Sequence, residues 1–296
     1  MSWTGWILLS AVFLAFYDIA KKTSVRDNAV LPTLLGSTIF GCIAFTIVTA
    51  LRGGLSSAIA PGGEVMVLSA AKAVIVSTSW IFTFSALRTL PVTIATPIRA
   101  SAPALVFIIA FFAYGEVPTI LQAAGMALVF AGYFAFSWAG RHEGIDFFRN
   151  RAVWCAFGGM FFSALSAIFD KFVFGVRGAP VNEIQFWFQI DLVIVYALVL
   201  TVSRVCPALN SSHRFVWRWS IPFVGILLAG ADWLYFTGIS DPSAPISVAA
   251  LMRRFSVVIT FLLGAKLLHE TNLRRKALAL AAILAGILIL TFTNHY

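Results

Sequence analysis

The sequence predicts an all-α polytopic membrane protein with ten transmembrane helices, arranged as two inverted five-helix repeats. Of its 296 residues, 60% are hydrophobic and only 11% are charged, and the mean hydropathy is +0.92. A soluble domain has about 25% charged residues, so this composition excludes an ordinary soluble protein. The apolar residues also form runs of about 20 residues, which is the length that a bilayer-spanning helix needs.

Ten such runs follow one another, separated by short breaks. The expected spans are residues 3–20, 31–51, 65–87, 91–114, 117–138, 152–173, 183–204, 217–239, 243–265 and 273–293. Pro91, Pro118 and Pro242 suit the breaks, because proline lacks a backbone N–H and disfavours helix in the residue before it. The polar connector 141–151 is expected to separate a first repeat, residues 1–140, from a second, residues 152–296.

Residues of the same type recur at corresponding places in the two halves. The matched pairs are Trp80 and Trp233, Pro91 and Pro245, Arg99 and Arg253, and Glu116 and Glu270. In each half the proline precedes the arginine by eight residues and the glutamate follows it by seventeen. An odd number of spans per repeat forces the two copies into opposite orientations, which is the usual architecture of secondary transporters.

The basic residues predict the orientation of these spans. The connectors after spans one, three, five, seven and nine hold fourteen Lys and Arg residues, and the opposite side holds three. The positive-inside rule places the fourteen in the cytoplasm, so both termini are expected outside. The net charge of +9 then indicates contact with anionic lipid headgroups and no nucleic-acid partner. We expect a multi-pass protein of a prokaryotic plasma or inner membrane, whose first span is a retained helix rather than a signal peptide.

Several motifs resemble the drug/metabolite transporter superfamily, and specifically its ten-helix EamA-type branch. They are the five-plus-five repeat, the Asp-Lys pair at 170–171, the run 87–91 that leads into span four, and the run 264–270 before the last helix. The resemblance covers nearly the whole chain and implies an alternating-access transporter with a central cavity, commonly an exporter of metabolites. The run 252–258 is also similar to the ninth helix of plastid phosphate translocators, where a Lys-Arg pair contacts the phosphate. That similarity implies a substrate contact for Arg253 and Arg254.

Four basic residues lie within the apolar runs, namely Lys72, Arg99, Arg253 and Arg254. A charged residue at the centre of a membrane helix costs at least about 2.5–3.5 kcal/mol and usually faces a cavity, a counter-ion or a substrate. All four are therefore candidate substrate-binding residues, and the alternative is that each is a structural clamp. Successive residues of a helix point about 100° apart. We expect Arg253, which has a repeat mate, to face the cavity, and Arg254 to be the structural member.

The candidate coupling or counter-ion residues are Asp232 in span eight and Asp191 in span seven. Asp232 is expected to pair with Arg253 or Arg254, because a very short loop joins their spans. Asp191 is expected to face Gln185 or Gln189, and Asp170 to lie near the surface at the end of span six. Four deep cations against two deep acids would leave positive charge that an anionic substrate completes.

Trp80, Trp233 and Tyr235 are candidates for the cavity wall, since pockets combine aromatic walls with a few polar groups. The alternative is that they are lipid-facing or interfacial side chains.

The leading hypothesis is a secondary transporter for a small organic anion, either phosphorylated or carboxylated. The alternatives are an exporter of amino acids or aromatic metabolites, and a flippase for an anionic lipid headgroup. We expect no enzymatic activity, no cofactor and no metal, and a phosphate-binding glycine loop is lacking, so ATP does not drive transport directly. A proton on Asp232 or a counter-anion would supply the coupling. The expected partners are the small-molecule substrate and the lipid bilayer, and the protein is expected to be a monomer or a homodimer.

Overall fold

The computed structural model describes residues 2–25, 28–89, 102–138, 151–205, 214–256, 258–260 and 273–292. Within these ranges the regular structure is helical throughout. The helices are α1 (Trp3–Val25), α2 (Val30–Leu51), α3 (Leu55–Ile59), α4 (Gly63–Thr89), α6 (Ala102–Tyr114), α7 (Ile120–Trp138), α8 (Arg151–Asp170), the π-helix η1 (Lys171–Val176), α9 (Val181–Val205), α10 (Ser220–Ile239), α11 (Ile246–Met252) and α13 (Leu273–Phe292).

Six helical segments of the described chain are long and apolar enough to cross a membrane. They correspond to α1, α2, α4, α8 with η1, α9 and α10. The predicted all-α, polytopic membrane fold is confirmed. Residues 91–101 of the expected span four and residues 261–265 of the expected span nine lie outside the described residues.

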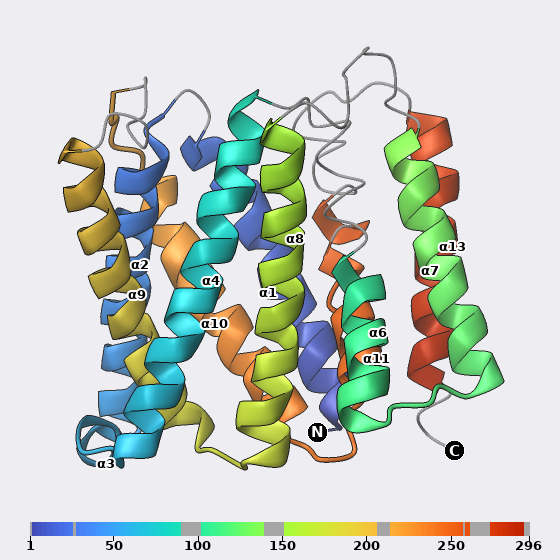
Figure 1. Ribbon diagram of the computed structural model, residues 1–296, viewed down its shortest axis with the longest axis horizontal. Helices are drawn as coiled ribbons and strands as arrows, with labels where there is room; N and C mark the ends of the chain where they lie inside the picture. The colour runs from blue at the N-terminus through green and yellow to red at the C-terminus, as the bar shows by residue number, and fades with distance from the viewer. Residues whose placement is uncertain are drawn as a thin grey trace.

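The helices run side by side as a bundle, in which α1 packs on α10, and α4 packs on α8 and α9 (Figure 1). The pair α7 and α13 forms one edge of the bundle. We call the end at which α1 begins the lower end, as drawn in Figure 1, and the other end the upper end. The lower end also holds the last turns of α2, α6, η1 and α10, and the first turn of α11. The positive-inside prediction assigns the upper end to the cytoplasm.

Small residues let α2 and α10 approach closely. A Cβ built on Gly225 of α10 would lie 1.8 Å from the carbonyl oxygen of Ser37 and 2.7 Å from the backbone nitrogen of Gly41. A Cβ on Gly286 of α13 would likewise lie 2.6 Å from the carbonyl oxygen of Gly125 in α7. Both contacts have the small-residue character of membrane helix interfaces, where close backbone approach supplies the packing energy.

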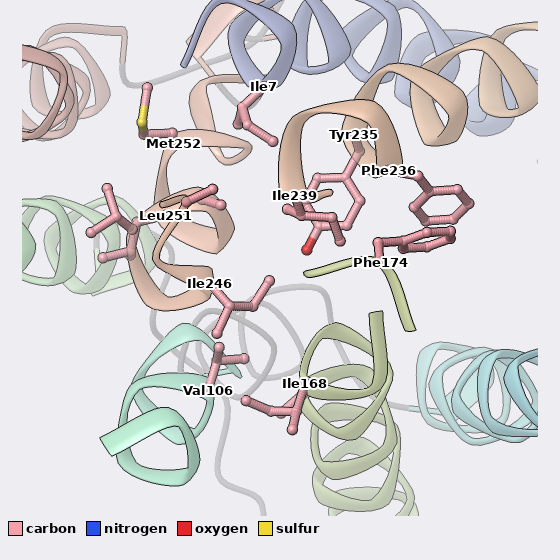
Figure 2. Close-up of a cluster of buried hydrophobic side chains, with 14 of the residues drawn as sticks. Ile7, Val106, Ile168, Phe174, Tyr235, Phe236, Ile239, Ile246, Leu251 and Met252 are labelled. Atoms are coloured by element: carbon pink, nitrogen blue, oxygen red, sulfur yellow. The ribbon is translucent and has the colours of Figure 1, made fainter. Parts of the chain in front are cut away.

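The apolar core is densest where α10 gives way to α11. Figure 2 shows side chains from α1, α6, α8, η1, α10 and α11 meeting there, and Ile7, Ile239 and Ile246 are fully buried. This apolar cluster lies at the lower end of the bundle, so it separates the interior from that end.

Candidate functional site

The first part of the site is an ion pair between α10 and α11. Arg253 donates from Nη2 to Oδ1 of Asp232 over 2.5 Å, and the two side chains are only 21% and 14% exposed. The Arg253 guanidinium also stacks on the ring of Tyr235, 4.3 Å from its centroid, and Tyr235 itself is buried. The sequence predicted that Asp232 pairs with Arg253 or Arg254, and the structure shows that the partner is Arg253.

The backbone explains why Arg253 and Arg254 behave differently. Helix α11 ends at Met252, and the Arg254 amide donates to the Leu251 carbonyl, three residues back, at 2.9 Å. This tighter turn interrupts the α-helix near the middle of the expected span nine. Discontinuous helices are where secondary transporters commonly form their binding sites.

A second ion pair joins Lys72 of α4 to Asp170 of α8, and the side chains are 2% and 6% exposed. The Lys72 ammonium also lies 4.3 Å from the centroid of the Phe236 ring. The expectation that Asp170 lies near the surface is wrong, because η1 continues α8 beyond it and carries it inside the bundle. Lys72 is therefore enclosed by its counter-ion and by aromatic rings.

The two pairs act on one another, since Asp170 lies within electrostatic range of both Asp232 and Arg253. They form a network of two cations and two anions in the lower half of the bundle. The expected count of two deep acids was too low, since Asp170 is a third. The excess of positive charge that the sequence indicated is therefore not found within this network.

A cavity of about 70 Å³ lies above the ion pairs. It is lined by Lys21, Ser79, Trp80, Thr83, Ala102, Gly159, Met160, Ser163 and Arg254. Two of these side chains are cationic and three carry hydroxyl groups, and the described lining includes no carboxylate. The Lys21 ammonium lies 5.5 Å from the centroid of the Trp80 ring, so one cation and the aromatic wall are in contact.

The structure places the two arginines opposite to expectation. Arg254 lines the cavity, whereas Arg253, which was expected there, is held by Asp232. Lys21 and the three hydroxyl residues were not among the predicted site residues. One signal was available, because Ser79 and Thr83 are four residues apart and so share a helix face beside Trp80. No signal in the sequence marked Lys21 as a site residue, because it resembles an ordinary cation at the end of a span.

The remaining candidates lie elsewhere. Trp233 matches Trp80 in the repeat, yet it lies near the lower end, where its Nε1 donates to Asn182 and the Arg52 guanidinium stacks on its ring 5.0 Å from the centroid. Asp191 accepts a hydrogen bond from the Ser69 hydroxyl at 2.8 Å, and not from Gln185 or Gln189 among the contacts described. Arg99 lies outside the described residues.

Comparisons with known proteins agree with this architecture. Residues 1–138 match the profile of the EamA-like transporter family. A crystal structure of another protein superposes with a TM-score of 0.74 at 20% sequence identity, covering 98% of this chain and 96% of that chain. At this identity the likeness shows the fold alone. Among curated proteins, none matches significantly. Residues 1–138, slightly less than half of the chain, are thus similar to the EamA-like transporter family, and the described chain has the helices of a multi-pass membrane protein.

Proposed function

We propose that this protein is a secondary transporter that moves a small organic anion, phosphorylated or carboxylated, through the central cavity by alternating access. The observation that supports this most directly is the cavity itself, in which Lys21 and Arg254 accompany three hydroxyl groups. Lys and Arg side chains that line a cavity can bind an anionic group, because they donate charge-assisted hydrogen bonds to carboxylate and phosphate oxygens.

The lining residues suit such a substrate chemically. The Arg254 guanidinium presents a fork that matches carboxylate or phosphate oxygens, and the Lys21 ammonium adds a point charge. The hydroxyls of Ser79, Thr83 and Ser163 supply neutral donors. Trp80 offers an apolar face for the organic part of the substrate, as in other small-molecule pockets.

The position of the cavity supports a direction of transport. The cavity occupies the upper half of the bundle, above the ion pairs. The charge distribution predicts that the upper end faces the cytoplasmic side of a prokaryotic inner membrane. An anion would enter from the cytoplasm, so we propose export. The two repeats, residues 1–140 and 152–296, would rock against each other around this point, and Arg99 would join the site from the first repeat.

The network beside the cavity would supply the coupling. Arg253 and Asp232 are joined to each other in this conformation, and an arriving anion would compete with Asp232 for Arg253. A proton on the released carboxylate, or a counter-anion in exchange, would complete the cycle. Coupling to a proton and coupling to a counter-anion both suit a protein whose sequence lacks a phosphate-binding glycine loop, because neither requires ATP.

Thermal stability of the purified protein tests the proposal. A ligand that binds only the folded protein raises its melting temperature with concentration. We expect a rise with phosphorylated or carboxylated metabolites from a panel that also contains aromatic amino acids and short-chain anionic lipids. Stabilisation by the amino acids alone would favour the amino-acid exporter in place of this proposal. Stabilisation by the lipids alone would favour the flippase.

Matched variants locate the site. Arg254→Gln and Lys21→Gln each remove one cation from the cavity, and each should weaken anion binding roughly 10- to 100-fold, the effect of losing one charge-assisted hydrogen bond. Arg177→Gln is the control, because it removes an exposed cation at the lower end. Unchanged binding in both cavity variants would exclude this cavity as the site.

A further inference from the structure

The segment that joins α10 to α11 is held from two sides by charged residues of other elements. On one side, Lys171 at the start of η1 donates from Nζ to the carbonyl oxygens of Pro242, at 3.2 Å, and Ala244, at 2.5 Å. Lys171 is itself buried. Its ammonium group is thus bound by backbone carbonyl oxygens inside the protein.

On the other side, Glu116 binds the amides of the same segment. Its carboxylate accepts from the backbone N–H of Ile246 at 2.8 Å, and from the N–H and hydroxyl of Ser247 at 3.2 and 2.7 Å. These N–H groups belong to the first turn of α11, where a helix has no partners of its own for its amides. Pro245, at the N-cap position, provides no side-chain bond. Glu116 therefore supplies the missing cap from the α6–α7 loop.

The position of Glu116 depends on the glycine before it. Gly115 ends α6 with a φ of +64°, a left-handed conformation that glycine adopts without the strain that a Cβ imposes. The chain therefore turns out of α6 and brings Glu116 beside α11. Lys171 also lies within electrostatic range of Glu116, so the two charged groups support each other.

The elements that make these contacts, the α6–α7 loop, η1 and the first turn of α11, lie at the lower end of the bundle (Figure 1), and Ile246 also belongs to the apolar cluster of Figure 2. The contacts fix the start of α11, the helix that ends directly before Arg253 and Arg254, and they lie six or more residues before the pair. They also join three elements, the α6–α7 loop, η1 and α11, that would have to separate if a path opened from the cavity to this end.

We propose that Glu116 and Lys171 are positioning residues for transport: together they hold the start of α11 and keep the lower end of the protein shut, and that end opens when their contacts with residues 242–247 separate. The inference rests on the proposed function only in that alternating access requires this end to open. The freed carbonyls and amides would then be hydrated by the water that fills an open cavity, which is where unpaired backbone groups are tolerated within a membrane protein.

Cysteine reactivity tests this without a substrate. Cys42, Cys155 and Cys206 are replaced by serine, and Ala249→Cys, a fully buried site in α11 between Ser247 and Arg253, becomes the reporter. The reaction rate with a soluble maleimide is measured on the purified protein in detergent. Glu116→Gln and Lys171→Gln should each raise the rate roughly tenfold, because each loses charge-assisted bonds that resist local opening. Ser247→Ala, a milder change, should raise it less.

Two controls separate opening of one end from general unfolding. Ala156→Cys, a buried reporter in α8 toward the upper end, should react at the same rate in all variants. Glu64→Gln, which removes an exposed carboxylate at the lower end, should leave the Ala249→Cys rate unchanged. Unchanged reactivity in Glu116→Gln and Lys171→Gln, or an equal rise at Ala156→Cys, would overturn the proposal. Anion binding is read separately from the melting temperature, so the proposed function and this inference fail independently.

Discussion

Arg253, the residue that follows α11, is bound to Asp232 of α10, and the pair is neither fully enclosed nor at the surface. A single residue later in the chain, Arg254 lines a cavity with a second cation. Two adjacent arginines therefore have separate roles in this conformation. Arg253 is bound to a protein carboxylate, whereas Arg254 lines the cavity that an anion would enter.

Asp232→Ala should destabilise the protein. It would leave the Arg253 guanidinium in a largely buried position without its carboxylate, and breaking one side of a buried pair costs about 3–5 kcal/mol. The partial exposure of both side chains puts the expected cost at the lower end of that range. The free energy of unfolding in an SDS titration measures it.

The double variant Asp232→Leu with Arg253→Met is the matched control for this prediction. Replacing a buried pair with apolar residues is often neutral, so the double variant should regain most of the stability that Asp232→Ala loses. A double variant as unstable as the single one would show that the cost comes from packing and not from the unpaired charge.

Lys72→Ala should destabilise the protein more than Asp232→Ala does. Its partner Asp170 is almost fully enclosed, so the uncompensated carboxylate would have less access to water. Melting temperatures of both variants in one detergent give the comparison. Glu64→Gln breaks the exposed contact of Glu64 with Arg177, whose side chains are 66% and 56% exposed, and should change stability by less than about 1 kcal/mol. If Lys72→Ala were as mild as Glu64→Gln, the enclosed pair would not hold α4 to α8.

Much of the helical framework could be predicted from the sequence, because apolar runs of bilayer length are a local property. The expected span 31–51 became α2, residues Val30–Leu51, and 183–204 became α9, residues Val181–Val205. The partner of Asp232 could also be narrowed to two residues, because the loop between α10 and α11 is short.

The directions of individual side chains could not be predicted in the same way. The rule that successive residues point 100° apart assumes a regular helix, and α11 tightens just where Arg253 and Arg254 occur. Asp170 was misplaced for a related reason, because the chain continues past it as a π-helix that the composition does not reveal. The contacts of Glu116 with α11 depend on a turn between elements distant in the sequence, which no local pattern specifies.

Gly225→Ala should destabilise the protein strongly. The added methyl group would overlap the backbone of α2 at Ser37, and backbone cannot move aside as a flexible side chain can. Overpacking of this kind costs about 1–3 kcal/mol, and sometimes more. Gly62→Ala is the control, because nothing lies within 4 Å of a Cβ at that position. Equal melting temperatures for the two variants would show that α2 and α10 do not approach as closely as described.

The proposed orientation gives the last prediction. If the upper end faces the cytoplasm, a reporter that works only in the cytoplasm should be inactive when fused after Tyr296 and active when inserted in the connector 141–151. The reason is electrostatic, since the fourteen basic residues of the odd-numbered connectors are retained on the cytoplasmic side during insertion. The matched insertion tests whether the reporter folds in this protein. Activity at Tyr296 with none in the connector would invert the predicted orientation, and the cavity of Lys21 and Arg254 would then lie in the outer half of the membrane, which would remove the support for export.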